Sequence, residues 1–271
     1  MHPTLFKIGP LEIHSYGLLL AVSFLLGILL ASHRAKKQGV NPDSIMDLSI
    51  VIVISAILGA RFLYVIAHLG EFRGHWLDVI NPFQSNGQVG IAGLTMLGGF
   101  IAALVFGMLY LYLKKLPALK IADILVPSLG LGIFITRIGC FLNGCCYGIP
   151  TDMPWGMVFP TECAAGYHFT GIPIHPAQLY SSFYGLVILV SLLLLERIKK
   201  FDGFLLYWFL ILYGFSRLTV DFFRYYEDSM VLFNIGNSPI SLNQGISFLM
   251  IIMGFLLIIL NLKKIKREKA G

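Results

Sequence analysis

Seven apolar runs, each close to the length of a membrane-spanning helix, constrain this chain more than any other feature of its sequence. A helix rises 1.5 Å per residue, so about 20 apolar residues are needed to cross roughly 30 Å of hydrocarbon. The runs are Tyr16–Ser32, Ile45–Ala67, Ile91–Leu113, Ile121–Phe141, Ala177–Leu195, Gly203–Phe223 and Gln244–Leu262. Only 13% of the residues are charged, whereas soluble domains carry about 25%. The sequence therefore predicts an all-α, polytopic membrane bundle of about seven spans, forming one integral membrane domain over residues 1–271.

The basic residues predict how this bundle is oriented. Most of the 20 Lys and Arg fall in four clusters, which are Arg34–Lys37, Lys114–Lys120, Arg197–Lys200 and Lys263–Lys269. With seven spans all four clusters lie on one side of the membrane, and cationic clusters in short loops stay in the cytoplasm. We therefore expect the N-terminus outside and the C-terminus in the cytoplasm. The net charge of +6 is then a topology signal, and no nucleic-acid partner is expected.

Three outer segments connect the predicted spans on the non-cytoplasmic side. They are Leu69–Gly90, Asn143–Pro176 and Arg224–Asn243. The second of these, residues 143–176, is rich in Gly, Pro and Trp, and we predict that it folds into a small non-cytoplasmic cap within the membrane domain.

Four arginines interrupt the apolar pattern. Arg61, Arg137 and Arg217 lie inside apolar runs, and Arg224 closes one. A charge inside a span costs at least a few kcal/mol unless it is paired or hydrated, so it indicates function by default. The guanidinium group suits phosphate, and on this topology all four lie in the outer half of their helices, which favours a phospholipid headgroup as ligand. The alternative is snorkelling and ion pairing, since Arg217 and Asp221 are spaced i, i+4.

The densest motif lies between Thr136 and Thr151, where an apolar helix passes into a glycine-containing loop. Such a loop at the interface offers backbone N–H groups to a phosphate. The stretch from Arg137 to Gly148 matches the frame of the signature of the bacterial prolipoprotein diacylglyceryl transferases, and the chain resembles this family. Further matching pieces follow in order, and they are His14–Gly17, Gly59–Arg61, Gly98–Gly99, His175–Tyr180, Arg217–Arg224 and Asn243–Gln244.

The resemblance implies a membrane enzyme of lipoprotein biosynthesis. Its members transfer a diacylglyceryl group from phosphatidylglycerol to the lipobox cysteine of a preprolipoprotein and release glycerol phosphate. It implies a multi-pass protein of the bacterial plasma or inner membrane, with phosphatidylglycerol, membrane lipid and preprolipoprotein signal peptides as partners and no cofactor. Arg137 and Arg217 are then the expected catalytic residues, because they stabilise the leaving phosphate. The expected substrate-binding residues are Tyr16, Arg61, Tyr64, Asn143, Gly148, His175, Gln178, Tyr180, Asp221 and Arg224.

The chain departs from the family pattern at several positions. The family usually has a histidine where this chain has Leu97, and Cys140 and Cys145 replace an Asn and a Glu of the signature. The general base is therefore open, and its candidates are His175, Asp221 and Tyr16. Two alternatives follow, namely a related membrane lipid transferase with a non-lipoprotein acceptor and a non-enzymatic lipid transporter.

The four cysteines are Cys140, Cys145, Cys146 and Cys163. Their spacing is poor for tetrahedral zinc and includes no C-x-x-C pair, so no metal is expected and free or buried thiols are the default. A disulfide, or a metal site shared with a nearby histidine, stays open as an alternative, and the sequence leaves the redox state undetermined.

Overall fold

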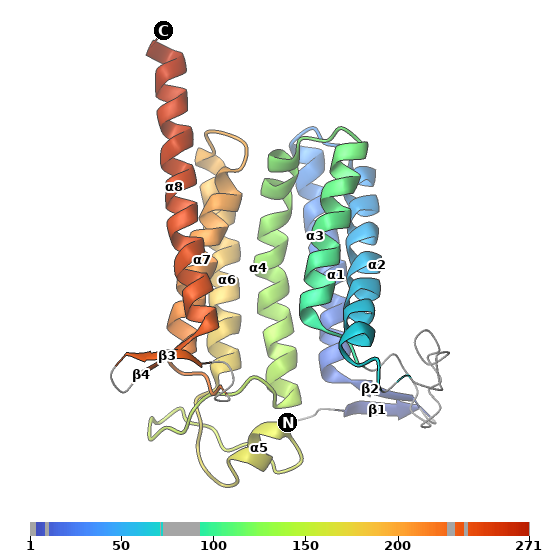
Figure 1. Ribbon diagram of the computed structural model, residues 1–271, viewed down its shortest axis with the longest axis vertical. Helices are drawn as coiled ribbons and strands as arrows, with labels where there is room; N and C mark the ends of the chain where they lie inside the picture. The colour runs from blue at the N-terminus through green and yellow to red at the C-terminus, as the bar shows by residue number, and fades with distance from the viewer. Residues whose placement is uncertain are drawn as a thin grey trace. The chain divides into compact units, whose positions relative to one another are not determined.

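The computed structural model describes residues 4–8, 11–70, 72, 93–226, 231–235 and 238–270 (Figure 1). Within these residues seven helices are long and apolar enough to cross a membrane. They are α1 (Ser15–Lys37), α2 (Pro42–Ala67), α3 (Met96–Leu113), α4 (Ala118–Asn143), α6 (Ala177–Leu195), α7 (Phe204–Asp221) and α8 (Leu242–Ala270). Each overlaps one predicted span, so the all-α polytopic membrane class is confirmed.

Short elements precede or connect the long helices. They are β1 (Thr4–Ile8), β2 (Leu11–His14), α5 (Ala164–His168), the 3-10 helix η2 (Glu196–Ile198), β3 (Val231–Ile235) and β4 (Ser238–Ser241). The strands pair as two antiparallel hairpins, β1 with β2 and β3 with β4. The apolar pattern did not predict these hairpins. Of the predicted outer segment Leu69–Gly90, only residues 69, 70 and 72 are described. Residues 91 and 92, at the start of the third predicted span, also lie outside the described residues.

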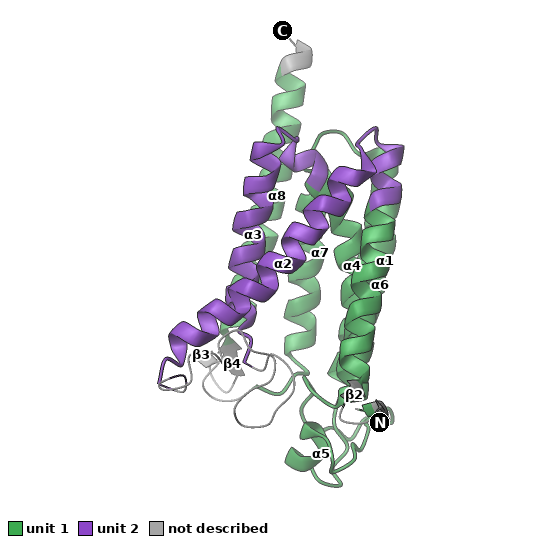
Figure 2. Ribbon diagram, turned by 90° about the vertical axis from the view of Figure 1, so that its right-hand side faces the viewer, with its two compact units in different colours: residues 1–31, 122–271 green, residues 32–121 purple. Residues whose placement is uncertain are grey.

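The described residues divide into two compact units, coloured in Figure 2. Unit 2 covers residues 32–121, and its helices α2 and α3 pack through glycines. A Cβ atom added to Gly59 would lie 2.6 Å from the Gly98 carbonyl oxygen, and one added to Gly99 would lie 3.0 Å from the Ala56 carbonyl oxygen. Small residues allow this approach, which matters in lipid because burial of apolar surface does not drive helices together there.

Unit 1 covers residues 1–31 and 122–271, and it contains α6, α7, α8 and most of α1 and α4. A Cβ atom on Gly185 of α6 would lie 2.6 Å from the Phe134 nitrogen of α4, so these backbones are in direct contact. Ser182 strengthens the same contact by donating to the Phe134 carbonyl oxygen at 2.8 Å. On the other face of α4, Ser128 donates to the Gly27 carbonyl oxygen of α1 at 2.8 Å. Helix α4 is therefore fixed to both α1 and α6.

A buried carboxylate fixes one end of unit 1. The Asp123 side chain of α4 accepts hydrogen bonds from the Gly203 and Leu206 backbone nitrogens at 2.8 and 2.9 Å, so it caps the start of α7. Lys199 lies 2.9 Å from Asp123 and 3.0 Å from Asp202. Burial lowers the pKa of Lys199, but the two carboxylates outweigh burial and raise it, so the ammonium stays charged. The starts of α4 and α7 and the end of α6 thus meet at this end.

The segment 143–176, which we predicted to be a cap, has its own small core at the opposite end of α4. Buried Phe159, Cys163, Ala165 and Ile174 form this core. Met157 and Ile174 exchange two backbone hydrogen bonds of 3.0 Å, which closes the segment on itself. Within unit 1 the segment also joins the end of α7, since the Ile149 nitrogen donates to the Phe223 carbonyl oxygen at 3.0 Å.

Candidate functional site

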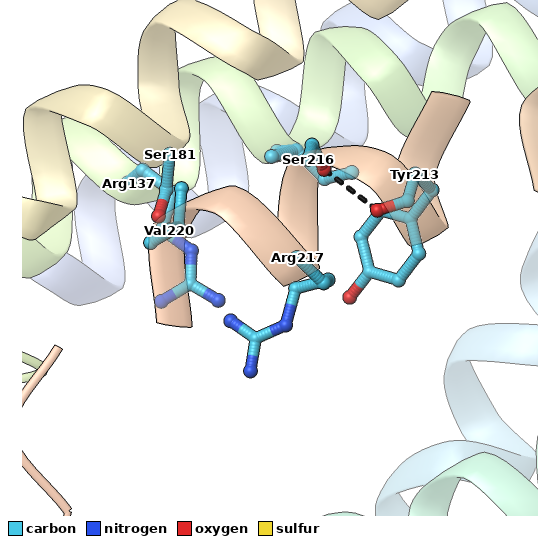
Figure 3. A pocket seen from close by; sticks show the side chains of 7 residues that line it. Arg137, Ser181, Tyr213, Ser216, Arg217 and Val220 are labelled. Atoms are coloured by element: carbon cyan, nitrogen blue, oxygen red, sulfur yellow. Dashed lines mark hydrogen bonds between the residues drawn. The ribbon is translucent and has the colours of Figure 1, made fainter. Parts of the chain in front are cut away.

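A cavity in unit 1 brings together polar side chains of three helices (Figure 3). Its lining residues are Ile133, Arg137, Ser181, Tyr213, Ser216, Arg217 and Val220. Figure 3 shows the guanidinium groups of Arg137 and Arg217 turned to the same side of the cavity. The structure thus places the two arginines that we predicted as catalytic in one site, 80 residues apart in the chain.

Arg137 has fewer hydrogen-bond and ion-pair partners than Arg217 in the part of the chain that the structure describes. It is half-buried on α4, and among the described residues it forms no ion pair and no hydrogen bond. A guanidinium group carries five N–H donors and is always charged. Inside an apolar helix bundle, such an unpartnered group favours an anionic ligand.

Arg217 is held by a polar network at the end of α7. Its Nη2 atom lies 3.3 Å from Asp221 Oδ1 and donates to the Tyr226 hydroxyl at 3.0 Å. Tyr226 in turn donates to Asp221 Oδ1 at 2.7 Å, and Ser241 donates to Asp221 Oδ2 at 2.9 Å. Burial raises the pKa of Tyr226 despite the opposing effect of Arg217, so the hydroxyl keeps its proton. Asp221 is therefore the acidic partner of Arg217, and its carboxylate contacts Arg217, Tyr226 and Ser241.

Arg224 and Gly148 join the cap to the end of α7. The Gly148 nitrogen donates to the His175 carbonyl oxygen at 3.1 Å, and a Cβ atom on Gly148 would lie 2.5 Å from the carbonyl oxygens of His175 and Phe223. Only glycine allows this approach. The Arg224 guanidinium lies 4.9 Å from the centre of the Tyr226 ring, so it belongs to the same neighbourhood as the Arg217 network.

His175 ends a hydrogen-bonded chain of aromatic residues. Trp155 Nε1 donates to the Tyr180 hydroxyl at 2.8 Å, and this hydroxyl lies 3.1 Å from His175 Nδ1. Burial lowers the pKa of His175, so its ring is neutral at neutral pH. The Tyr180 hydroxyl therefore bridges Trp155 and His175, and the tautomer of His175 decides which of the two groups donates in the bond between them. As a base through Nδ1, His175 would first have to release Tyr180.

The remaining predicted residues of unit 1 surround the end of α4. Gln178 is fully buried, and its Nε2 atom donates to the Cys145 carbonyl oxygen at 2.8 Å. The Asn143 side chain forms a hydrogen bond with the Cys145 thiol. Tyr16, at the start of α1, packs on Gly139, where an added Cβ atom would lie 3.4 Å from the Tyr16 Cα. These residues hold the loop that follows Arg137.

Arg61 and Tyr64 belong to unit 2. Arg61 is buried, and its Cζ atom lies 5.1 Å from the centre of the Phe72 ring and 5.9 Å from that of Tyr64. It also donates to the Gly93 carbonyl oxygen at 3.4 Å. Aromatic faces and a carbonyl oxygen thus stabilise this buried cation within its own unit.

Comparison with known proteins identifies the family. Residues 3–260 match the family described as prolipoprotein diacylglyceryl transferase. The chain belongs to this family. Three relatives are each named phosphatidylglycerol–prolipoprotein diacylglyceryl transferase. The protein of Clostridium tetani is 32% identical over 268 residues, covering 99% of this chain and 100% of the relative.

The other two relatives are as similar and nearly as fully covered. The protein of a Nostoc species is 35% identical over 260 residues, covering 93% of this chain and 86% of the relative. The protein of Photobacterium profundum is 35% identical over 260 residues, covering 95% and 92%. The resemblance read from the sequence motifs is therefore confirmed.

The structure of this diacylglyceryl transferase family member also gives contacts for several residues that its sequence did not single out. Ser181 lines the cavity and donates to the Ala177 carbonyl oxygen at 2.9 Å. Our prediction missed Tyr226 and Ser241, because no helical spacing connects them to Asp221. It also missed Trp155 as a partner of Tyr180, since a tryptophan in a cap is ordinary at a membrane interface.

Proposed function

We propose that this chain transfers a diacylglyceryl group from phosphatidylglycerol to the lipobox cysteine of a preprolipoprotein, with glycerol phosphate as the leaving group. Its family and the names of its relatives support the donor and the acceptor, and they do not favour the transporter or another acceptor. The structural observation that carries the proposal is the cavity shared by Arg137 and Arg217. Two guanidinium groups in an apolar bundle suit the phosphodiester of a lipid.

In the proposed reaction a cysteine thiolate of the acceptor attacks the glyceryl CH₂ carbon that bears the phosphate. A C–S bond forms, the C–O bond breaks, and its electron pair goes to the phosphate oxygen. The leaving group therefore gains a second negative charge. Arg137 and Arg217 stabilise that charge in the transition state, which is where electrostatic stabilisation accelerates a reaction. The same positive field favours the thiolate form of the attacking cysteine.

The network around Asp221 positions Arg217 for this role. Asp221 and Tyr226 both contact the Arg217 guanidinium, at 3.3 and 3.0 Å, so its plane is fixed before substrate binds. A group that is already oriented needs no rearrangement when charge develops. Tyr226 and Asp221 are thus positioning residues, and Arg137 is the group that has free donors for the lipid.

The proposed orientation places the cavity near the outer face of the membrane. In unit 1 the basic segment Arg197–Lys200 lies at the end fixed by Asp123, and the cap lies at the other end of α4. The positive-inside rule assigns the basic end to the cytoplasm. The acceptor cysteine and the phosphate of the donor lipid would then meet on the outer side, with the N-terminus outside and the C-terminus in the cytoplasm.

A reconstituted transfer assay tests this proposal. Purified protein in phosphatidylglycerol-containing micelles is incubated with a lipobox peptide, and mass spectrometry measures addition of a diacylglyceryl group to the cysteine. Arg137→Ala should lower the transfer rate by about 100-fold or more, the usual effect of removing a donor to a developing oxyanion. Arg197→Ala, which removes an arginine from the opposite end of unit 1, is the matched control and should transfer normally. Full transfer by a folded Arg137→Ala protein would show that the assignment is wrong.

A further inference from the structure

Three thiols gather where α4 ends and the cap begins. Cys140 is buried in the last turn of α4, and Cys145 and Cys146 follow it half-buried. Their three Sγ atoms lie within 4.8 Å of one another, and all are free thiols. We call these residues the thiol triad. The sequence spacing argued against a tetrahedral zinc site, but the fold produces a group of three.

The backbone holds the thiol triad in place. The Cys145 nitrogen donates to the Cys140 carbonyl oxygen at 3.1 Å, so the chain turns back directly after the helix. Gly144 and Cys146 both adopt positive φ angles, 69° and 60°, which bring successive side chains to one side. Buried Gln178 fixes the turn from α6 through its 2.8 Å bond to the Cys145 carbonyl oxygen. The sulfurs are therefore preorganised as a group.

The separation of the sulfurs suits a single ion. Thiolates bind ions such as zinc at about 2.3 Å, so three thiolates around one ion stand roughly 4 Å apart. The triad is already within 4.8 Å, and side-chain rotation closes the difference. Thiolates are soft ligands, which select Cu(I) and zinc among the available cations.

The charges near the triad favour a monovalent ion. The positive charges of Arg224 and Arg137 act on the thiol triad at Cys146. Three thiolates and one monovalent cation carry two negative charges, which these two arginines neutralise. A divalent cation would leave one positive charge unbalanced in a partly buried site, and such a charge is costly.

We propose that Cys140, Cys145 and Cys146 form a three-coordinate binding site for a soft monovalent cation of the Cu(I) class. Binding forms three metal–sulfur bonds, and every thiol that becomes a ligand gives up its proton to solvent. If the proposed function holds, occupancy also inhibits transfer, because the anionic complex attracts Arg137 away from the lipid phosphate.

Anaerobic titration with Cu(I) tests the site directly. Purified protein in detergent competes with a chromophoric Cu(I) chelator of known affinity, and we expect one equivalent to be retained. Cys140→Ser and Cys145→Ser should each weaken retention at least tenfold. Cys163→Ser is the matched control, because the Cys163 thiol donates to the Pro160 carbonyl oxygen at 3.1 Å and lies outside the triad. If the buried Cys140 variant fails to fold, Cys146→Ser provides the same comparison at a half-buried position.

Four results would overturn the inference, and three of them come from the titration itself. They are the absence of retained Cu(I), retention that the triad substitutions leave unchanged, and retention of Zn(II) as tight as that of Cu(I). A disulfide within the triad, found by mass spectrometry of the purified protein together with loss of Cu(I) retention, would overturn it too. The titration does not require activity. Normal transfer by a protein that binds no Cu(I) therefore contradicts only the metal site, and a protein that binds Cu(I) but transfers nothing when it is free of Cu(I) contradicts only the proposed function.

Discussion

Replacing Tyr226 by Phe removes one oxygen from the network that orients Arg217. This oxygen accepts from Arg217 at 3.0 Å and donates to Asp221 at 2.7 Å, so two hydrogen bonds to charged groups are lost. The ring remains, and with it the contact with Arg224 at 4.9 Å. Arg217 and Asp221 also keep their direct contact of 3.3 Å. The substitution therefore loosens Arg217 without removing its charge.

The expected effect follows from the value of such bonds. A hydrogen bond to a charged group contributes about 1.5–3 kcal/mol, and the surviving ion pair limits the loss to roughly one such bond. At about 1.4 kcal/mol per factor of ten, kcat/KM for transfer should fall about 10- to 100-fold. The rate is measured per folded protein in the lipobox-peptide assay, so that a loss of stability is not counted as a loss of activity.

Tyr225→Phe is the matched control for this experiment. Its ring stacks on Tyr147 with centroids 5.8 Å apart and an angle of 13°. Among the described residues its hydroxyl forms no hydrogen bond, so this variant should transfer within about threefold of the wild type. The reasoning is refuted if Tyr226→Phe keeps wild-type kcat/KM, or if both variants lose activity equally.

Three further predictions concern stability. Asp123→Ala should lower the free energy of unfolding by about 3–5 kcal/mol in detergent titrations, because Lys199 loses one of its two carboxylate partners and α7 loses both hydrogen bonds of its cap. Gly59→Leu should lower the midpoint of thermal unfolding by separating α2 from α3, whereas Gly132→Leu, with open space at its Cβ position, should leave it unchanged. Burial lowers the folded-state pKa of His175, so its contribution is present above the unfolded-state pKa of about 6.5 and is lost as pH falls below it. His175→Asn should therefore reduce the loss of stability between pH 6.5 and 5, measured by unfolding at each pH.

The sequence predicted the helices well because each of them obeys a local rule. A span needs a continuous apolar run, and that run can be counted without knowledge of its neighbours. The third span shows the limit of this rule. Its apolar run starts at Ile91, but the helix starts at Met96, after Gly93 with a φ of 74° and after the Thr95 hydroxyl that donates to the Ala60 carbonyl oxygen. A tertiary contact thus determined where this helix begins.

The site was predictable only in part, for the same physical reason. A charge inside an apolar run is visible in the sequence, which is how Arg137 and Arg217 were found. Tyr226, Cys145 and Cys146 lie in loops, where no periodicity relates spacing to proximity. The thiol triad illustrates this, since Cys146 reaches Cys140 only because Gly144 and Cys146 have positive φ angles. Loop conformation, rather than spacing, brought the sulfurs together.

Asp221 pairs with Arg217 and not with Arg137, and this difference leads to a last prediction. Asp221 offsets the charge of Arg217, so the two arginines and Asp221 carry a net charge of +1, which matches a phosphodiester monoanion. The product is a phosphate dianion, so the cavity that holds it carries a net charge of −1. Asp221→Asn keeps a side chain of the same shape and raises the net charge of these three side chains to +2.

Product inhibition measures this effect. In an effective dielectric of about 20, unit charges about 8 Å apart interact by roughly 2 kcal/mol, which is a factor of at least ten in binding. We expect the inhibition constant for glycerol phosphate to fall about tenfold or more in Asp221→Asn, and the KM for phosphatidylglycerol to fall less because that ligand carries one charge. Asp202→Asn, at the opposite end of unit 1, should change neither constant. An unchanged inhibition constant in a folded Asp221→Asn protein would mean that Asp221 holds Arg217 in place without setting the charge of the cavity.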